Sequence, residues 1–280
     1  MDVNPQLTSP TEVRALLDQL GHRPNRGLGQ NYLIDANILD GIVKLAALES
    51  TDRVLEIGPG LGALTERILK QNVNFRCIEK DSSMAGYLRK RFPGLDLMEA
   101  DAMDVNLNEI FASGVNKVVA NLPYSVASRL MVEIAEGSYR PDRMCLTIQK
   151  EVADRLTAKP GDRAYGVLSI LTAFFYECRL VKKVSPTCFL PAPKVWSAVV
   201  QMDCRAEVWV EEEEYPMVKR LVKYCFSQRR KQITTSLKNL GVKSVGALLS
   251  ELDISPKKRP EQLEPQRWIA MARWLQSREA

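Results

Sequence analysis

Acidic residues stand at the ends of two short apolar segments in the first half of the chain, and their types suit a ligand that carries hydroxyls and an amine. Glu79 ends the segment 74–79, and Asp101 follows the segment 95–99. A carboxylate at the end of a strand can accept hydrogen bonds from both hydroxyls of a ribose, and a second one can accept from the exocyclic amine of an adenine. Glu79 and Asp101 are therefore candidate ligands of an adenosine cofactor.

A glycine-rich turn precedes Glu79, in the sequence Val54-Leu55-Glu56-Ile57-Gly58-Pro59-Gly60-Leu61-Gly62. Glycines in such a turn let the backbone approach a ligand closely. Glu79 lies 21 residues after Gly58, the spacing expected for a ribose ligand. The turn alone does not distinguish a dinucleotide from another adenosine cofactor, but Glu56-x-Gly58-x-Gly60 is typical of S-adenosylmethionine enzymes rather than of nicotinamide enzymes.

The next apolar segment, 117–120, runs into Asn121-Leu122-Pro123-Tyr124. An exocyclic amine is a poor nucleophile because its lone pair is delocalised into the ring. An amide oxygen and a nearby main-chain carbonyl can accept the two amine hydrogens, and an aromatic ring can stack on an extruded base. We therefore predict that Asn121 is the acceptor, that Leu122 and Pro123 form a stiff turn with exposed carbonyls, and that Tyr124 is the stacking ring.

These motifs require elements that bring strand ends together. Apolar strands are predicted at 53–57, 74–79, 95–99, 117–120 and 144–149, with helices near 64–70, 84–91, 106–111 and 125–136. Alternation of strand and helix predicts an α/β fold, a doubly wound parallel sheet of the Rossmann-like kind covered on both faces. Two further strands, 179–184 and 198–202, are separated by a proline-rich loop that could close the sheet with a hairpin.

The two ends of the chain differ from this pattern. Residues 1–34 are predicted to form an N-terminal arm with one short helix, and Asp35 is the expected N-cap of the next helix. Helices are predicted at 215–227, 231–240, 245–252 and 265–276. We therefore expect an arm (1–34), a methyltransferase domain (35–205) and a smaller all-α domain (206–280).

Composition excludes several classes of protein. The chain has 280 residues, 45% hydrophobic and 26% charged, with no apolar run long enough to span a membrane and no signal sequence, so we expect a cytoplasmic protein. Its six cysteines are widely spaced and its only histidine is His22, which argues against disulfides, a metal site and Ser-His or Cys-His catalysis.

Positive charge is concentrated near the C-terminus. Residues 181–280 contain 18 Lys and Arg against 11 Asp and Glu, whereas residues 1–180 contain 21 against 23. The interval 215–250 has eight basic residues and no acidic one, which favours a nucleic acid over a solvated helix face. Lys219, Lys223 and Arg230 would share one helix face if the helix continues past residue 227, with Arg229 and Lys231 beside it.

Taken together, the motifs resemble those of the KsgA-type small-subunit ribosomal RNA adenine dimethyltransferases. The resemblance extends from Gly29 to about Lys238. It includes Gly29-Gln30-Asn31-Tyr32-Leu33, the glycine turn, Asn121-Leu122-Pro123-Tyr124, the segments 149–153 and 164–169, the proline-rich 189–197 and the basic 226–231. The last two segments are specific to this family. The chain departs from it at Gly27-Leu28, where a basic residue and Phe are usual, at Tyr32, where Phe is common, and at Lys80, where an apolar or polar residue is more usual.

The resemblance implies an enzyme that uses S-adenosylmethionine to dimethylate N6 of two adjacent adenines near the 3′ end of small-subunit rRNA. Its substrate would be that RNA or a pre-assembled small subunit, and the enzyme would act as a monomer, away from membranes, in ribosome biogenesis. The cofactor residues carried over are Asn31, Leu33, Gly58, Glu79, Asp101 and Asn121. Phe189 is a candidate second face for the target base, and Arg229, Arg230 and Lys231 are candidate RNA contacts.

Three alternatives stay open. A large-subunit rRNA methyltransferase shares the catalytic motif, but the segment 189–197 and the basic helical tail favour the small-subunit type. A non-catalytic assembly or transcription factor could keep the fold, although intact Asn121 and Tyr124 argue against it. A nicotinamide oxidoreductase would need an acid or base to handle the hydride, which this sequence does not obviously offer.

Overall fold

The computed structural model describes residues 5–24 and 29–278. Its contacts divide the chain into two compact units, which we describe separately. The first consists of Met1–Ala153 with Arg179–Cys204, and the second of Asp154–Cys178 with Arg205–Ala280. The second unit therefore takes in 154–178, which our expected boundary at residue 205 assigned to the methyltransferase domain. Eight residues of the expected arm, 1–4 and 25–28, lie outside the described residues.

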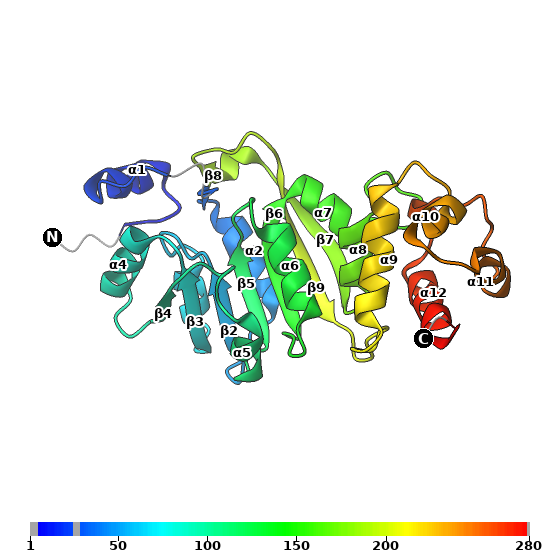
Figure 1. The fold of residues 1–280 in the computed structure, drawn as a ribbon. Coiled ribbons are helices and arrows are strands. Elements are labelled where there is room, and N and C mark those ends of the chain that lie inside the picture. The colour runs from blue at the N-terminus through cyan, green and yellow to red at the C-terminus, as the bar shows by residue number, and fades with distance from the viewer. Residues whose placement is uncertain (1–4, 25–28, 279–280) are drawn as a thin grey trace. The chain divides into compact units, whose positions relative to one another are not determined.

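A seven-stranded sheet forms the centre of the first unit, in the order β4-β3-β2-β5-β6-β9-β7 (Figure 1). The strands are β2 (Arg53–Ile57), β3 (Asn74–Glu79), β4 (Asp96–Glu99), β5 (Lys117–Asn121), β6 (Arg143–Gln149), β7 (Tyr176–Val184) and β9 (Ser197–Cys204). The first five in sequence are parallel, and β9 pairs antiparallel with β6. The predicted Rossmann-like sheet is confirmed. Its order reverses between β2 and β5, where such folds bind ligands at the carboxyl ends of the strands.

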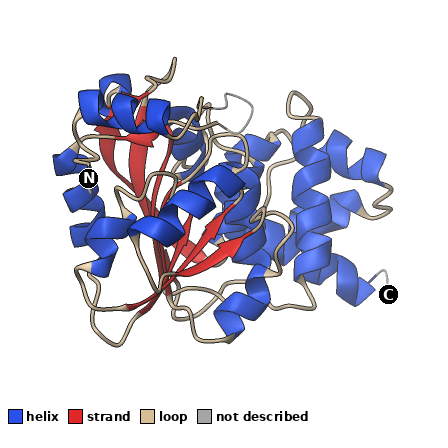
Figure 2. Ribbon diagram, turned by 90° about the vertical axis from the view of Figure 1, so that its left-hand side faces the viewer, coloured by secondary structure: helices blue, strands red, loops and turns tan. Residues whose placement is uncertain are grey.

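Helices lie on both faces of this sheet (Figure 2). The helices of this part of the chain are α1 (Pro10–Gln19) in the arm, α2 (Ala36–Ala46), α3 (Thr65–Leu69), α4 (Ser82–Arg91), α5 (Leu107–Ala112), α6 (Ala127–Glu136) and α7 (Lys150–Leu156), of which α7 was not predicted. The expected cap is present, because the Asp35 carboxylate accepts from the Ile38 amide at 3.0 Å. Asp81 caps α4 in the same way, accepting from the amides of Ser83 and Met84. These caps fix where each helix leaves the neighbouring strand or arm.

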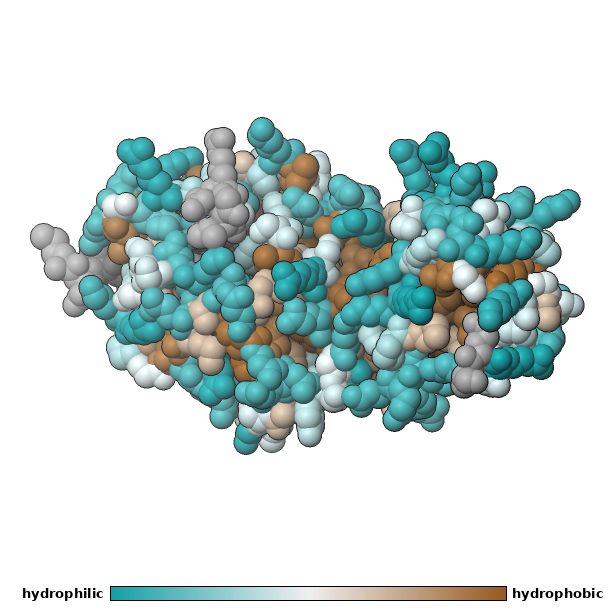
Figure 3. All heavy atoms as spheres, in the orientation of Figure 1, coloured by the Kyte–Doolittle hydropathy of each residue, from teal (hydrophilic) through white to brown (hydrophobic). Residues whose placement is uncertain are grey.

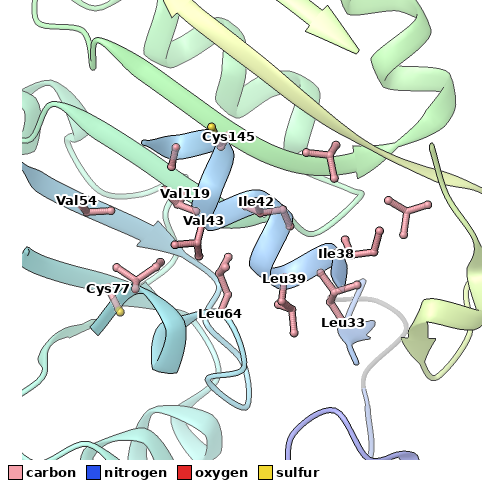
Figure 4. Packing of buried hydrophobic residues seen from close by; sticks show 14 of the residues in the cluster. Leu33, Ile38, Leu39, Ile42, Val43, Val54, Leu64, Cys77, Val119 and Cys145 are labelled. Atoms are coloured by element: carbon pink, nitrogen blue, oxygen red, sulfur yellow. The ribbon is translucent and has the colours of Figure 1, made fainter. Parts of the chain in front are cut away.

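The core under α2 explains which polar side chains lie at the carboxyl ends of the parallel strands. Ile38, Leu39, Ile42 and Val43 of α2 lie among alternate residues of the strands, including Val54, Cys77, Val119 and Cys145 (Figure 4). Side chains two residues apart on a strand point to the same face. Glu56, Glu79 and Asn121 each follow one of these core residues by two positions, so they face the α2 side at the carboxyl ends of their strands.

The arm joins this unit through a second, two-stranded sheet. Strand β1 (Tyr32–Leu33) pairs antiparallel with β8 (Phe189–Leu190), with Leu33 opposite Phe189 and Tyr32 opposite Leu190. β8 follows the short 3-10 helix Pro186–Cys188 of the proline-rich segment. Residues that are distant in sequence thus hold the arm against the sheet domain.

The second unit is mainly helical, as predicted for the C-terminal part. It contains α8 (Val167–Ala173), α9 (Tyr215–Ser227), α10 (Ile233–Leu240), α11 (Val245–Glu251), the 3-10 helix Pro260–Gln262 and α12 (Pro265–Arg278). Trp268 is fully buried, and Tyr165 packs edge-on against Phe226 while its hydroxyl donates to the Leu263 carbonyl at 2.8 Å. Aromatic packing therefore holds 154–178 and the C-terminal helices together.

The visible surface over α10 is strongly hydrophilic (Figure 3).

Within the described residues, no helix has both the length and the apolar character needed to cross a membrane.

Candidate functional site

A pocket lies at the carboxyl ends of β2, β3 and β5. It is lined by the arm (29–33), the glycine turn (56–64), the end of β3 (78–80), Asp101 with Ala102, and the segment 121–126. Every residue predicted from the sequence to bind the cofactor or to belong to the catalytic motif is among them: Asn31, Leu33, Gly58, Glu79, Asp101, Asn121, Leu122, Pro123 and Tyr124. The fold thus gathers residues that are up to 93 positions apart in the chain.

The glycine turn is shaped by its close neighbours. Gly58, Gly60 and Gly62 all have positive φ values, of 72°, 58° and 87°. A Cβ atom on Gly60 would lie 2.9 Å from Cε1 of Tyr32, so the ring of Tyr32 covers this turn. A side chain at Gly60 would be both strained and blocked.

The carboxylate of Glu79 is held by main-chain amides. Gly60 donates to one of its oxygens and Asp81 to the other, each at 2.9 Å. Glu79 is only 6% exposed, and burial is the main cause that raises its pKa. Because each carboxylate oxygen can accept more than one hydrogen bond, Glu79 can also accept from a bound diol.

Asp101 lies beside Lys80, one of the residues at which the sequence departs from the motifs that it resembles. The Lys80 ammonium is 2.6 Å from Oδ2 of Asp101, and the Met103 amide donates to Oδ1 at 2.9 Å. The hydrogen bond from Lys80 is the main cause that lowers the pKa of Asp101. Asp101 is therefore a charged acceptor at the edge of the pocket.

Asn121 is oriented by the arm. Its Nδ2 donates to the main-chain carbonyl of Asn31 at 3.0 Å, and the Asn31 side chain donates to the carbonyl of Gly29 at the same distance. With its amino group committed to Asn31, the amide oxygen of Asn121 is the group left to accept from a ligand. The arm therefore positions the motif on β5.

Tyr124 is anchored at the far end of its ring. Its hydroxyl lies 2.5 Å from the hydroxyl of Ser197, the fully buried first residue of β9. Burial raises the pKa of Tyr124, so the phenol stays neutral at physiological pH. The ring borders the pocket in a fixed position.

Two groups at this site were given no role of their own in the sequence analysis. Glu56 entered it only as part of the glycine-turn pattern. It lines the pocket but is 1% exposed, accepting from Thr65 Oγ1 at 2.6 Å, and burial raises its pKa to about 8. The second group holds the arm: Gln30 donates to Asp81 at 2.9 Å, and its side-chain oxygen lies 3.1 Å from His22 Nε2.

Phe189 is not brought to the pocket. Its side chain is 2% exposed and lies in the core cluster with Leu33 and Ile38, outside the pocket lining. On β8, Phe189 lies opposite Leu33 of β1, and its side chain packs into the core cluster around α2. The expected second face of a base sandwich is therefore not formed by Phe189 in this structure.

The basic residues of the second unit are also arranged differently from our expectation. Helix α9 ends at Ser227, so Arg230 lies in the turn before α10 and does not share a helix face with Lys219 and Lys223. Arg229 donates to the carbonyl of Arg163 at 2.8 Å. Of the three predicted RNA contacts in this turn, Arg230 and Lys231 are exposed, whereas Arg229 also serves the unit's own structure.

Comparison with known proteins agrees with the geometry. The family described as ribosomal RNA adenine dimethylase matches residues 21–277. A ribosomal RNA small subunit methyltransferase A from Syntrophotalea carbinolica is 37% identical over 260 residues, covering 92% of this chain and 98% of that protein. One from Magnetococcus marinus is 42% identical over 235 residues, covering 81% and 84%.

Two solved structures are similar in fold. A dimethyladenosine transferase from Plasmodium falciparum has a TM-score of 0.77 at 25% identity, covering 87% of this chain and 96% of that one. The 23S rRNA methyltransferase ErmE has a TM-score of 0.67 at 24% identity, covering 87% and 99%. At that identity, the likeness to ErmE shows the fold alone.

Proposed function

Because the chain belongs to the ribosomal RNA adenine dimethylase family, we propose that it dimethylates N6 of two adjacent adenines near the 3′ end of small-subunit rRNA. The methyl donor is S-adenosylmethionine, and the RNA is free or part of a pre-assembled small subunit. Relatives named for the small subunit, which cover nearly the whole chain, support this substrate over large-subunit RNA. Intact Asn121 and Tyr124 support an enzyme over a non-catalytic factor.

The residues around the pocket fit such a cofactor. Glu79 is a buried carboxylate at the end of β3 with its orientation fixed by two amides, which suits the hydroxyls of a ribose. Asp101 suits an adenine amine, and Gly58, which lines the pocket and has no side chain, suits close approach of a ligand to the backbone. When bound, S-adenosylmethionine supplies an electrophilic methyl group on a sulfonium.

The arrangement of Asn121 carries the proposal. Its amide oxygen can accept one hydrogen of the target amine, because its amino group is held by the Asn31 carbonyl. From the sequence, the second acceptor could be the main-chain carbonyl of either Leu122 or Pro123. The Pro123 carbonyl accepts from the Val126 amide at 3.3 Å, so the Leu122 carbonyl is the better candidate. Two acceptors on the amine localise its lone pair on nitrogen, the state that methyl transfer from the sulfonium would require as the methyl–sulfur bond breaks and the thioether leaves.

Tyr124 holds the base in place. Its ring borders the pocket and is fixed by the hydrogen bond to Ser197, so it can stack on an adenine taken out of the RNA. The exposed cations Arg230 and Lys231 of the second unit supply phosphate contacts, which add affinity for the nucleic acid without reading its bases.

The test is methylation of small subunits that lack the modification. We expect labelled methyl groups from S-adenosylmethionine to appear as N6,N6-dimethyladenine in small-subunit RNA, and not in large subunits offered in parallel. Naked RNA in a third reaction shows whether the particle is needed. The variant Asn121→Ala should abolish transfer, whereas Asn37→Ala, an exposed asparagine on α2, should leave it intact. Transfer by Asn121→Ala at the parent rate would refute the assignment of the motif.

Cytoplasmic location, the monomeric state and the role in ribosome biogenesis stay predictions from the sequence and the family.

A further inference from the structure

Two exposed apolar side chains lie next to each other just before β9. Val195 is 46% exposed and Trp196 is 51% exposed, although most large apolar residues of the described chain are buried. A half-exposed indole leaves a large apolar surface in water, which is unfavourable unless something covers it. The segment therefore suits a partner that stacks on a flat ring.

The main chain places Trp196 beside the candidate catalytic motif. Its carbonyl accepts from the Lys150 amide at 2.9 Å, and the next residue, Ser197, pairs with Gln149 of β6. Ser197 is the residue whose hydroxyl holds Tyr124. Trp196 is thus one residue, or about 3.8 Å between Cα atoms, from the anchor of the ring that borders the pocket.

The two neighbours differ sharply in exposure. Ser197 is fully buried and reaches Tyr124 inside the protein, whereas the indole of Trp196 is on the surface. The preceding segment is stiffened by Pro191 and Pro193, and it carries the exposed cation Lys194. A rigidly placed aromatic ring with a neighbouring cation is the combination that proteins use to bind unpaired nucleotides.

We propose that Trp196 stacks on an unpaired base of the substrate RNA that flanks the adenine held by Tyr124. This rests on the proposed function, since Trp196 could contact a nucleotide next to the adenine only if Tyr124 holds that adenine, and Trp196 adjoins the residue that anchors Tyr124. A flanking contact of this kind also selects unpaired RNA over duplex, because bases within a helix do not offer their faces. Trp196 would then be a substrate-positioning residue outside the pocket.

The proposal is tested with Trp196→Ala and Trp196→Phe and a matched control, Tyr139→Ala. Tyr139 is another aromatic residue, 54% exposed, beyond the end of α6 that lies away from the pocket. The probe is a short single-stranded RNA with two adjacent adenines and unpaired flanks. Trp196→Ala should raise its dissociation constant about 5- to 150-fold, and Trp196→Phe should raise it less. Tyr139→Ala should not change it.

Fluorescence provides a readout that a structural role would not change. Trp196 is one of four tryptophans, and stacking on a base should quench it. Titration with the RNA should quench the parent, and Trp196→Phe should lose that quenching while its affinity for S-adenosylmethionine stays at the parent value. Equal quenching in both proteins, or unchanged RNA affinity in Trp196→Ala, would overturn the proposal.

Failure of the proposed function is distinguished from failure of the stacking proposal by the methylation assay. If the proposed function is wrong, the parent protein transfers no methyl groups to small subunits, whatever the quenching experiment shows. A change in oligomeric mass in Trp196→Ala without a change in RNA binding would assign this surface to a protein contact and would also overturn the stacking role.

Discussion

Replacing Glu56 with Gln should make the protein more stable at neutral and alkaline pH. Glu56 is buried in the sheet beneath the pocket, and its carboxylate accepts from Thr65 and from the Cys77 thiol. Burial raises its pKa from 4.5 to about 8. A glutamine at this position keeps an oxygen that can accept from Thr65 but has no charge to bury, so the variant isolates the effect of ionisation.

The sign and size of this difference in unfolding free energy follow from the linkage between proton binding and folding. Between its unfolded pKa of 4.5 and its folded pKa of about 8, Glu56 binds more protons in the native state than in the unfolded state, so stability falls as pH rises through this window. At about 1.4 kcal/mol per pKa unit, the parent should lose about 4 kcal/mol relative to Glu56→Gln between roughly pH 5 and pH 9. Below about pH 4 the contribution vanishes because both states are protonated.

The assay is urea unfolding of both proteins in steps across this pH range, with unchanged m-values as the check that the transition is the same. Exposed Glu177→Gln is the control and should follow the parent. If the difference in unfolding free energy between parent and Glu56→Gln is flat from pH 5 to pH 9, then Glu56 is ionised in the folded protein throughout, and our reasoning from burial is refuted.

Three further outcomes are expected at the site and in the second unit. Glu79→Gln should weaken S-adenosylmethionine binding by about 1 to 3 kcal/mol because it removes a charged acceptor, and calorimetry showing the parent affinity in a folded variant would remove the ribose assignment. Tyr124→Ala should reduce turnover much more than RNA affinity, since the base enters the pocket only after the RNA has docked; single-turnover methylation with parallel binding measurements checks this. Arg230→Ala with Lys231→Ala should reduce the slope of log affinity against log salt by about 1.4 to 1.8, whereas Arg229→Ala should also lower the melting temperature; an unchanged salt slope would show that the two exposed cations do not contact phosphates.

The sequence alone predicted the parts of the site that depend on local pattern. The glycine turn, the acids after two strands and the motif at Asn121 each follow an apolar strand, and parallel strands in a doubly wound sheet end at one edge. Once that topology is inferred, Glu79, Asp101 and Asn121 must be neighbours, and the structure brings them to one pocket.

The remaining features depended on contacts between segments that are far apart in the chain. The side of β8 to which Phe189 points is known only once β8 is paired with β1, and in this pairing Phe189 is buried. In the same way, only the fold brings Ser197 to Tyr124 and buries the Glu56 carboxylate deeply enough to raise its pKa. Periodicity determines which face a side chain takes within its own element, but the environment of that face is set by the elements packed against it, and therefore only by the tertiary structure.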